Sequence, residues 1–540
     1  MATIAESRLP LLPSVIAQCR KRRNTLKLAD STGAKLTGNE TLVRALVLRR
    51  VLRHHFLKED ERMVGIMLPS TVAGAISNLA LAFDRRVSVN LNFALSGDAL
   101  DKSIAQAGLR HIITSRKLLE RLDMAERPEH IILEDIPALV GKRDKLAAAA
   151  DGMALPTRLL VRKLGLHTIE PDELLTVLFT SGSTGEPKGV MLSHDNVTSN
   201  GQAMIHGIDI RETDLLIGVL PFFHAFGLTV TLWTPLICNA ATAYHTSPLE
   251  AEHIGQLTRA YNGTILMATP TLLRLYMARC TPEQFASLTM VATGAEPLLP
   301  EVVDAFEARF GLRPFQGYGA TEASPAIAFN TPPDRAPDHT TALLKDGTVG
   351  RPIELVKIEI RDQESGESLP TGNQGMIWCA GPNVMLGYLG QPELTAKVVI
   401  DGWYQTGDIG VLDEDGFLKI TGRASQFSKI AGETVPHLLI EGELARLLGA
   451  DQSETPIIAV TAVPDSRKGE RIVVVHAPVA MSAAALCAGL RAAGLPPLYI
   501  PMTDSFIQVD TLPVLPTGKI DLGGVRKIAN AHFAPPIATV

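Results

Sequence analysis

A loop of hydroxyl-bearing residues and glycines near the middle of the chain could bind phosphate. It follows the apolar segment 174–179, and its first six residues are Thr180, Ser181, Gly182, Ser183, Thr184 and Gly185. Lys188 adds a cation before a second apolar segment. Backbone N–H groups and hydroxyls around a cation form an anion-binding concavity. A solvated turn is the ordinary alternative, but the apolar segments on both sides favour a phosphate site.

This loop resembles the signature of the adenylate-forming superfamily, which includes acyl-CoA synthetases, peptide-synthetase adenylation domains and luciferases. It is not a P-loop, because no Gly-Lys-Ser/Thr follows Gly182 at the required spacing. The resemblance implies that ATP and Mg2+ convert a carboxylic acid to an acyl-adenylate. The acyl group then passes to the thiol of coenzyme A or of holo acyl carrier protein. Residues 180–185 and Lys188 would hold the triphosphate, with Thr184 at the reacting phosphate.

A second glycine-rich segment, residues 315–325, combines an aromatic ring with a hydroxyl and a carboxylate. Tyr318 stands between two glycines, the second of them Gly319, and can lay its ring against a flat base. Thr321 can donate to the α-phosphate. The carboxylate of Glu322 suits Mg2+, which keeps water and phosphate oxygens as its other ligands. A plain turn would also fit this composition, but its occurrence together with the first loop favours nucleotide binding.

Three further segments carry residues that the resemblance assigns to the nucleotide. Gly294, Ala295 and Glu296 would form part of the wall around the adenine and the acyl carbonyl, although a strand-to-helix turn explains them equally. Asp408 would accept hydrogen bonds from both ribose hydroxyls, because an ionised carboxylate is a natural acceptor for a vicinal diol. Arg423 would lie near the ribose and the phosphate.

His224 follows Pro221-Phe222-Phe223, and a histidine in such apolar company is usually a core residue. The resemblance places it at an aromatic gate between the ATP site and the acyl tunnel. Enzymes of this superfamily that activate amino acids have an aspartate near this point, whereas residues 221–226 contain no carboxylate. A buried ammonium without a partner would be costly, so we expect an uncharged, apolar acid.

The chain from about residue 170 to about residue 525 resembles a narrower group most closely. This group is the acyl-carrier-protein ligase half of bifunctional 2-acylglycerophosphoethanolamine acyltransferase/acyl-carrier-protein synthetases. Residues 220–230, 234–240 and 422–435 carry the likeness. It implies a medium- or long-chain fatty acid as substrate and acyl carrier protein as acceptor, with free coenzyme A as the alternative.

The resemblance assigns the two half-reactions to different parts of the C-terminal region. Lys519 follows Pro516-Thr517-Gly518 and matches the catalytic lysine of adenylation, although a surface lysine is the ordinary alternative. Lys429 begins a segment that would approach the adenylate in the second step. Ser425 occupies a hinge position that usually holds Asp or Lys. A small polar residue can absorb the backbone change, so we expect the rotation to persist with altered kinetics.

Apolar periodicity predicts the elements that position these residues. Residues 41–56 and 71–84 have helical spacing, whereas 63–67, 87–91 and 111–114 are typical of strands. This order predicts a mostly parallel sheet with helices on its faces. Asp195 and Asn196 are predicted to cap a helix.

The expected fold class is α/β, with a large N-terminal region of βα sheets, a β-rich subdomain and a small mobile α+β C-terminal lid. The AMP-binding domain would cover residues 1–424, with short glycine-punctuated strands forming the subdomain over about residues 345–424. The lid would cover residues 425–540, with its hinge at Ser425.

Composition indicates a soluble enzyme of a reducing compartment. The 540 residues are 46% hydrophobic and 20% charged, and the net charge of −6 predicts no attraction to nucleic acid. Five cysteines without C-x-x-C spacing indicate neither a disulfide framework nor a cysteine zinc site. With no signal peptide and no apolar run long enough to span a bilayer, we expect a cytoplasmic location.

Three alternatives remain open at this level. The basic amphipathic segment 156–166 could rest on anionic lipid at the inner face of the membrane, although its leucines more often pack on the core. The spacing of His55 and Asp60 matches glycerolipid acyltransferases, but two residues at one spacing arise readily by chance. The third alternative is a binding protein that keeps the fold but has no catalytic activity. The presence of Lys519 and Glu322 favours an enzyme.

Overall fold

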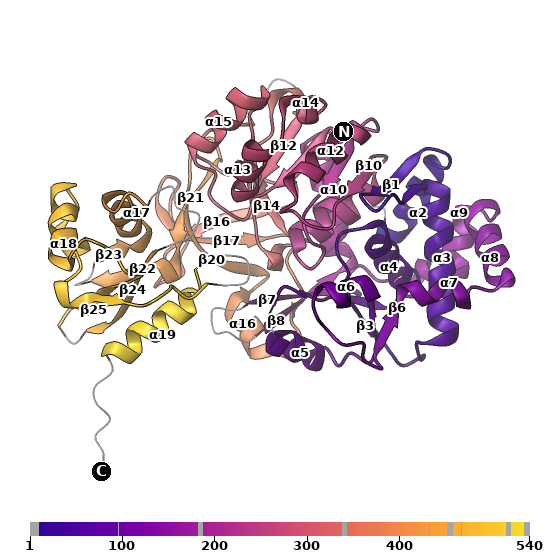
Figure 1. The fold of residues 1–540 in the computed structure, drawn as a ribbon, viewed down its shortest axis with the longest axis horizontal. Helices are drawn as coiled ribbons and strands as arrows, with labels where there is room; N and C mark the ends of the chain where they lie inside the picture. Colours follow the sequence, from indigo (N-terminus) through magenta and orange to yellow (C-terminus); the bar gives the residue numbers. More distant parts are fainter. Residues whose placement is uncertain are drawn as a thin grey trace, which may run out of the picture.

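The computed structural model describes residues 10–95, 97–181, 187–336, 343–430, 433–450, 457–465, 467–514 and 520–533, without the side chains of Ser181, Ser425, Lys429 and Thr434. The strands described group into four sheets. In Figure 1 two of these sheets and their helices form the main body, and the third lies between that body and the C-terminal sheet. The expected α/β class with a β-rich region and a small C-terminal α+β unit is confirmed.

The first sheet is mixed, with the described strands in the order β15-β14-β13-β12-β11-β9-β10-β1-β2. The strands from β13 to β1 in this order are parallel, so their carboxyl ends share one edge, whereas β2, β14 and β15 are antiparallel to their neighbours. Their bounds are β1 Leu26–Asp30, β2 Lys35–Thr37, β9 Leu215–Gly218, β10 Ala241–Tyr244, β11 Ile265–Ala268, β12 Met290–Thr293, β13 Phe315–Gly319, β14 Ala326–Phe329 and β15 Arg351–Pro352.

The second sheet has the order β18-β8-β7-β4-β3-β5-β6 among the described strands. It contains the three strands predicted early in the chain, and β8 runs antiparallel to β7, so a strand follows the glycine loop as expected. The two strands that precede these three early strands, β1 and β2, join the first sheet, so the early part of the chain contributes to both sheets. The bounds are β3 Met63–Ile66, β4 Val87–Asn90, β5 Ile112–Thr114, β6 His130–Ile132, β7 Leu174–Ser181, β8 Pro187–Ser193 and β18 Gly387–Tyr388.

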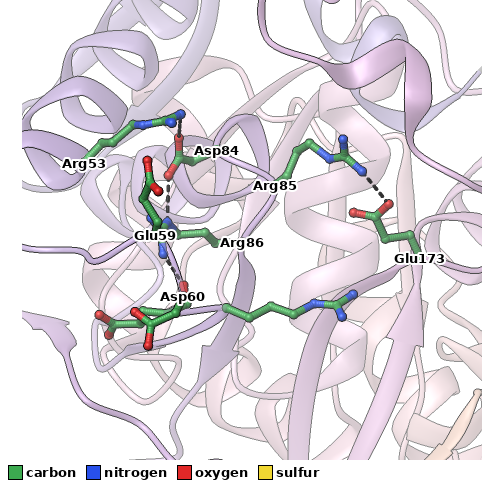
Figure 2. A pocket seen from close by; sticks show the side chains of 9 residues that line it. Arg53, Glu59, Asp60, Asp84, Arg85, Arg86 and Glu173 are labelled. Carbon is green, nitrogen blue, oxygen red and sulfur yellow. Dashed lines mark hydrogen bonds and ion pairs between the residues drawn. The ribbon is translucent and has the colours of Figure 1, made fainter.

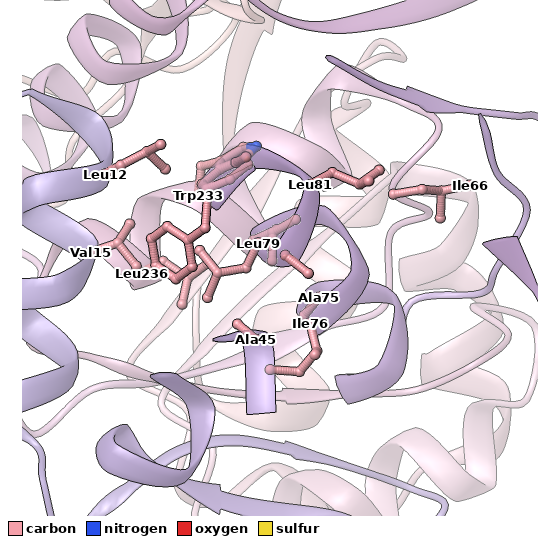
Figure 3. Close-up of a cluster of buried hydrophobic side chains, with 14 of the residues drawn as sticks. Leu12, Val15, Ala45, Ile66, Ala75, Ile76, Leu79, Leu81, Trp233 and Leu236 are labelled. Atoms are coloured by element: carbon pink, nitrogen blue, oxygen red, sulfur yellow. The ribbon is translucent and has the colours of Figure 1, made fainter. Parts of the chain in front are cut away.

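Helices between and around these sheets form the main core. Helix α4 (Val72–Phe83) is apolar nearly all round, is buried almost throughout, and contacts strands of both sheets. Figure 3 shows its side chains beside Trp233 and residues of the N-terminal helix α2. The other helices of this body are α2 Leu11–Lys21, α3 Gly38–His55, α5 Gly97–Gln106, α6 Arg116–Arg121, α10 His194–Gly207, η4 Phe226–Trp233, α11 Thr234–Ile237, α12 Ala251–Tyr261, α13 Pro270–Arg279, α14 Pro282–Phe285 and α15 Pro300–Phe310.

Helix α10 begins one turn earlier than its predicted caps. The side chain of Ser193 accepts from the backbone N–H of Asn196, and the side chain of Asn196 accepts from the N–H of Ser193. This reciprocal capping box satisfies two N–H groups at the helix start. Asp195 and Asn196 therefore lie in the first turn, and Ser193 is the cap.

The segment before β7 forms short helices, of which α7 Ile136–Leu139, α8 Lys142–Ala149 and η2 Ala150–Ala154 pack on α3 and α9 Thr157–Lys163 packs on α2. Within the basic segment 156–166, Leu160, Leu164 and Leu166 are buried, and Leu159 is 50% exposed. Packing on the core, the favoured alternative, accounts for three of its four leucines. Among the described residues, no helix is both long and apolar enough to cross a bilayer.

The remaining strands form two smaller sheets. The third sheet pairs β16 with β17, β17 with β20, and β20 with both β19 and β21, and the fourth has the described order β23-β22-β25-β24 with β26 beside β25. Helices α17 and α19 pack on β24. The bounds are β16 Lys357–Arg361, β17 Gln374–Ala380, α16 Pro392–Val398, β19 Val399–Ile400, β20 Trp403–Leu412, β21 Leu418–Arg423, β22 Phe427–Ile430, β23 Glu433–Pro436, α17 His437–Leu447, β24 Ile458–Asp465, β25 Gly469–His476, α18 Ala483–Ala492, β26 Phe506–Gln508 and α19 Leu522–Phe533.

Candidate active site

Tyr318, Asp408 and Arg423 form a hydrogen-bonded group between the first and third sheets. The Tyr318 hydroxyl donates to Oδ2 of Asp408 over 2.6 Å, and Nε of Arg423 donates to Oδ1 over 2.8 Å. Asp408 and Arg423 are paired across β20 and β21, so the antiparallel register places them side by side. Each carboxylate oxygen keeps a lone pair for a further donor.

The protonation states of this group follow from burial and from the Asp408 charge. Burial and the adjacent Asp408 carboxylate raise the pKa of Tyr318 well above its ordinary value, so the phenol remains a neutral donor. The Asp408 charge also raises the pKa of Arg423. Beside Asp408, Tyr318 is therefore a neutral phenol and Arg423 a charged guanidinium.

Glu322, Tyr388 and Lys188, which are far apart in the sequence, form a second group. The Tyr388 hydroxyl donates to Oε1 of Glu322 over 2.8 Å, and Nζ of Lys188 lies 5.5 Å from the centre of the Tyr388 ring. Thr180 is paired with Lys188 across β7 and β8, so the two ends of the glycine loop lie together. Burial and the Glu322 charge raise the pKa of Tyr388, which keeps this phenol a donor. Sequence reasoning missed Tyr388, whose only sequence signal is the motif Gly387-Tyr388.

Buried amides hold the backbone just after Glu322. Nδ2 of Asn200 donates to the carbonyls of Ala323 and Ala326 over 3.2 and 2.8 Å, and Nδ2 of Asn383 donates to the same two carbonyls over 3.0 Å each. Asn196 on the same helix as Asn200 donates to the carbonyls of Pro382 and Val384. These contacts fix Glu322 between α10 and the loop before β18. The sequence signal was weak, because α10 contains several polar residues and nothing in its spacing distinguishes Asn196 and Asn200.

The predicted wall at residues 294–296 lies at the end of β12, next to β13. An added Cβ at Gly294 would lie 3.2 Å from the ring of Phe226, so this backbone packs directly against an aromatic side chain. At Gly319 an added Cβ would lie 2.3 Å from the carbonyl oxygen of Pro325, which excludes any larger residue. Glu296 accepts from N and Oγ1 of Thr271 in the first turn of α13, so its carboxylate also serves a structural contact. Ala295 is exposed, with a φ of +69°.

His224 is exposed and precedes the helical segment that contains Phe226. Its ring lies 4.8 Å from that of Phe223, which in turn packs edge-on against Phe93 at 5.1 Å. It is therefore not a packed core histidine. Phe93, Phe223 and His224 are thus in ring contact, and Phe226, two residues after His224, packs against Gly294.

Several predicted site residues lie outside the part that the structure describes. These are Gly182, Ser183, Thr184, Gly185 and Lys519, together with the side chains of Ser181, Ser425 and Lys429. Thr321 is the first residue of the helical turn Thr321–Ala323, which contains Glu322. The structure thus brings Tyr318, Glu322, Asp408, Arg423, Lys188 and Thr180 to one region, with residues 294–296 and His224 along its border.

The donor set at Glu322 fits a hard divalent cation. Mg2+ prefers carboxylate, phosphate and water oxygens and rarely has more than two protein carboxylates. Glu322 offers one carboxylate that a phenol orients through Oε1, and lone pairs remain for a metal ion. The expected magnesium ligand is chemically suitable.

A hollow of about 580 Å3 lies at the opposite, amino edge of the second sheet. Figure 2 shows it lined by charged side chains from the residues just before β3, β4 and β7. Arg85 pairs with Glu173 over 2.9 Å, and Arg86 pairs with Asp84 over 2.7 Å. Asp60 accepts from Arg110 over 3.0 Å, so the carboxylate of the acyltransferase-like spacing is held in an ion pair. Because these charged side chains pair with one another, we interpret the hollow as a surface ion-pair network that is separate from the candidate active site.

Comparison with known proteins defines the class that this fold and site represent. The model of the AMP-binding enzyme family matches residues 15–389. The chain belongs to this family, and its fold is that of the adenylate-forming superfamily. A feruloyl-CoA synthase of Amycolatopsis sp is 30% identical over 500 residues, which cover 92% of this chain and 94% of that protein. A 4-coumarate–CoA ligase of Pinus taeda is 29% identical over 424 residues, covering 76% and 74%.

Solved structures agree with this assignment. ATP-bound MatB from Rhodopseudomonas palustris superposes with a TM-score of 0.73 and 26% identity, covering 96% of this chain and 98% of that one. The o-succinylbenzoate CoA synthetase of Bacillus subtilis, solved with its acyl-adenylate intermediate, superposes with a TM-score of 0.77. At 20% identity over 96% and 98% of the two chains, the latter supports the fold alone. Three of these four proteins are named as coenzyme A synthases or ligases, and none of the four is named as an acyl-carrier-protein ligase.

Proposed function

We propose that this enzyme activates a carboxylic acid with ATP to an acyl-adenylate and transfers the acyl group to the thiol of coenzyme A. The observation that carries the proposal is the Asp408 carboxylate, held by Tyr318 and Arg423 beside the Glu322 group. A fixed carboxylate, a flat ring and a guanidinium suit a ribose, a base and a phosphate. The names of the relatives favour coenzyme A as the acceptor.

Each group then has a defined task in nucleotide binding. Asp408 accepts from the ribose hydroxyls, Tyr318 lies against the adenine and Arg423 faces the ribose and phosphate. Lys188 and the loop that begins at Thr180 hold the triphosphate, and residues 294–296 border the adenine and the acyl carbonyl. Glu322 would hold Mg2+, which when bound supplies positive charge to the phosphate oxygens.

In the first step a carboxylate oxygen of the acid attacks the α-phosphorus of ATP and displaces pyrophosphate. Charge develops on the phosphate oxygens, so catalysis depends on positioning and on donors fixed in advance. Thr184, Thr321 and Lys519 would donate to these oxygens. In the second step a thiolate attacks the acyl carbon and releases AMP, and no residue of the chain needs to act as a nucleophile.

The residues near Gly294 favour a substrate acid that carries no charged group besides its carboxylate. The segment 221–226 carries no carboxylate to pair with a substrate ammonium, and Phe93, Phe223 and Phe226 gather beside it. We include both medium- or long-chain fatty acids and the aromatic acids ferulate and 4-coumarate in the proposed substrate class. His224 is proposed as the gate between nucleotide and acid.

Pyrophosphate release with a panel of these acids tests the first step. We expect acid-dependent release with at least one uncharged acid and none with amino acids. Adding coenzyme A or holo acyl carrier protein then identifies the acceptor by the thioester formed. Exclusive use of the carrier protein would show that the enzyme is an acyl-carrier-protein ligase, as the narrower resemblance implies. Binding of ATP without any turnover would establish a non-catalytic protein.

A cytoplasmic location is proposed, with peripheral membrane contact as a subordinate proposal. Three of the four leucines in segment 156–166 are buried, which leaves Leu159 and basic side chains for a lipid surface. Co-sedimentation with anionic vesicles tests this contact. Retention of the protein in the supernatant would contradict the proposed membrane contact.

Replacing Asp408 with asparagine should raise the KM for ATP about 10–100-fold, because a hydrogen bond to a charged group is worth about 1.5–3 kcal/mol. The asparagine keeps the size of the side chain and one acceptor. Initial rates of pyrophosphate release at varied ATP give this value. Asp413→Asn is a matched control, since Asp413 lies in the same hairpin but pairs with Lys345. Equal effects in both variants would contradict the ribose role.

Replacing Tyr388 with phenylalanine should slow adenylation about tenfold or more, because it removes the donor that orients the Glu322 carboxylate. We further expect this variant to need more Mg2+ for half-maximal rate, which a purely structural loss would not produce. Tyr276→Phe is the control, because it removes a similar buried phenol that donates to the carbonyl of Pro248. An unchanged Mg2+ requirement in Tyr388→Phe would contradict the positioning role.

A further inference from the structure

Two histidines and a glutamate converge beyond the carboxyl end of β10. Nε2 of His245 lies 3.1 Å from Oε2 of Glu250, and Nδ1 of His253 lies 3.6 Å from the same oxygen. In the described part of the chain, these three residues form a group whose candidate ligand atoms all lie within 4.8 Å of one another. The two imidazole rings are nearly parallel, at 14°, with centroids 5.6 Å apart.

These separations match the donor spacing of a tetrahedral zinc site. With Zn–N and Zn–O bonds of about 2.0–2.1 Å, tetrahedral ligand atoms lie about 3.3 Å apart. The two measured separations lie on either side of that value, and the third pair of ligand atoms lies within 4.8 Å. Rotation of the exposed His253 ring out of its stack on His245 would direct both imidazole lone pairs to one ion. Imidazole and carboxylate donors suit Zn2+, whereas Mg2+ prefers oxygen ligands alone.

The contacts of His245 resemble the outer support that metal-binding histidines have. Its Nδ1 lies 2.7 Å from Oγ of Ser31, which leaves Nε2 directed toward Glu250. Histidine ligands usually use their second ring nitrogen in this way. The side chain of His245 is only 4% exposed. Burial lowers its pKa, with opposition from Glu250, so the ring is in the neutral form that binds metal.

The backbone of this group is fixed by both neighbouring strands and by α12. The N–H of His245 donates to the carbonyl of Gly218 on β9, and the N–H of Ser31 donates to the carbonyl of Tyr244. Glu250 immediately precedes α12, and His253 lies in the first turn of that helix. The ligands therefore come from rigid elements. The side chains of His253 and Glu250 are 63% and 41% exposed, so an ion can reach them from solvent.

We propose that His245, Glu250 and His253 bind Zn2+, with solvent at the fourth position. The ion would join β10 to α12 and stabilise the far end of the first sheet. Three strand spacings separate β10 from β12, about 14 Å along the sheet edge, so this site is separate from the nucleotide site. The proposal does not depend on the proposed function.

Calorimetric titration of chelator-treated full-length protein with ZnCl2 tests the site. We expect one saturable equivalent, a higher Tm with Zn2+, and no comparable binding of MgCl2 at the same concentration. His253→Ala should abolish this binding and the rise in Tm while pyrophosphate release stays unchanged, because His253 is exposed and the fold should survive. Ser31→Ala should weaken binding about 10–100-fold.

His206→Ala is the matched control, since His206 pairs with Glu354 on the surface at 3.9 Å. It should bind Zn2+ as the unaltered protein does. Co2+ substitution adds a spectroscopic test, because a tetrahedral site gives intense visible absorption that His253→Ala should lose. Absence of saturable Zn2+ binding, or binding that His253→Ala leaves intact, would overturn the proposal and identify the group as a hydrogen-bonded helix cap.

Discussion

Lys519→Ala should slow acyl-adenylate formation by about 10²–10³-fold, the usual loss when one fixed donor to a developing charge is removed. The same variant should still convert supplied acyl-adenylate and thiol to thioester at nearly the normal rate. The reason is that lysine at this position is proposed to serve only the phosphate chemistry. The side chain itself lies outside the described residues, but Val514 and Ile520 on either side of its segment are bridged, which ties the ends of this segment together.

The two half-reactions can be measured separately in this variant. Pyrophosphate exchange reports adenylation, and AMP release from added acyl-adenylate reports thioester formation. Lys527→Ala provides the control, because Lys527 is an exposed lysine on the same C-terminal unit. Comparable losses in both half-reactions of Lys519→Ala would show that the residue acts on stability or on a shared step.

Such a separation would support a rotation of the C-terminal unit between the steps. Strand β21 of the third sheet ends at Arg423 and β22 of the fourth sheet begins at Phe427, so the short turn Ala424–Gln426 is the chain connection between the two sheets. We propose that the chain turns about Ser425, which withdraws Lys519 and brings Lys429 toward the adenylate. Closure of this kind commonly separates two chemistries in one enzyme.

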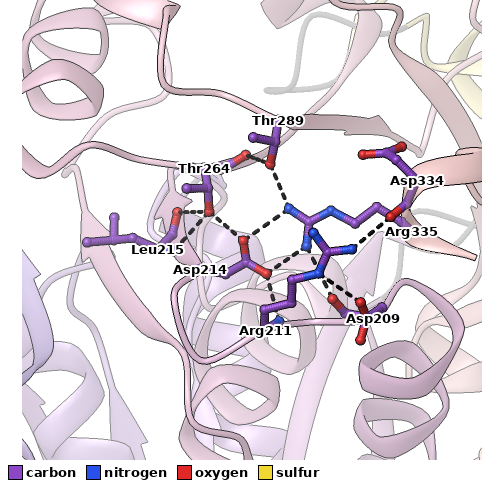
Figure 4. Close-up of polar contacts among 8 residues, drawn as sticks. All are labelled: Asp209, Arg211, Asp214, Leu215, Thr264, Thr289, Asp334 and Arg335. Carbon is purple, nitrogen blue, oxygen red and sulfur yellow. Dashed lines mark hydrogen bonds and ion pairs between the residues drawn. The ribbon is translucent and has the colours of Figure 1, made fainter. Parts of the chain in front are cut away.

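Arg335→Met should reduce the free energy of unfolding by about 3–5 kcal/mol, the usual cost of removing one partner of a buried ion pair. Figure 4 shows Arg335 against Asp214, and both side chains are at most 3% exposed. Its Nη1 and Nη2 donate to the two carboxylate oxygens over 2.7 and 3.0 Å, and Nη2 also donates to Thr289. Without the guanidinium, the Asp214 charge would remain buried with only Thr264 and the Arg211 N–H as donors.

Urea unfolding followed by tryptophan fluorescence measures this loss. Arg335→Met with Asp214→Asn should be more stable than Arg335→Met alone, because the amide removes the unpaired charge and can still accept from Thr264. Asp346→Ala is the control, since it breaks the exposed Arg313 pair at 2.7 Å, and such surface pairs contribute little. A loss in Arg335→Met no larger than in this control would contradict the prediction.

The same pair makes a defined contribution to acid sensitivity. Burial raises the pKa of Asp214, but hydrogen bonds from Arg335, Arg211 and Thr264 outweigh it, and the pKa lies below its ordinary value. The group therefore binds fewer protons in the folded protein than in the unfolded chain. Its stabilisation is present above the ordinary Asp pKa of about 3.9 and is lost as the pH falls through the folded value.

Local patterns were sufficient for the class of fold, and they located the segments proposed for the site. Glycine loops and strand periodicity depend on neighbouring residues, so the β7–β8 turn and the Tyr318–Glu322 segment could be located from residue types and spacing. The resemblance added Asp408 and Arg423, which lie far away in the chain. Their antiparallel pairing follows from a hairpin, which is also a local feature.

Contacts between distant segments could not be predicted in this way. The sheet that β1 joins depends on the strand with which its backbone pairs. Lys27 can be buried because its Nζ donates to three carbonyls, at residues 235, 238 and 240. Tyr388 joins Glu322 from 66 residues away. No periodicity in a single segment records such partners.

The amino-acid sequence by itself determined the α/β fold class and, through its resemblance, predicted an adenylate-forming enzyme with Tyr318 and Glu322 near the nucleotide, because glycine loops and strand periodicity depend on residue type over short distances. Only the tertiary structure decided which groups orient them, how Arg335 and Asp214 are buried together, and where His245, Glu250 and His253 meet. The physical reason is that burial and hydrogen-bond partners are properties of packed elements, and packing brings together residues that the chain keeps far apart.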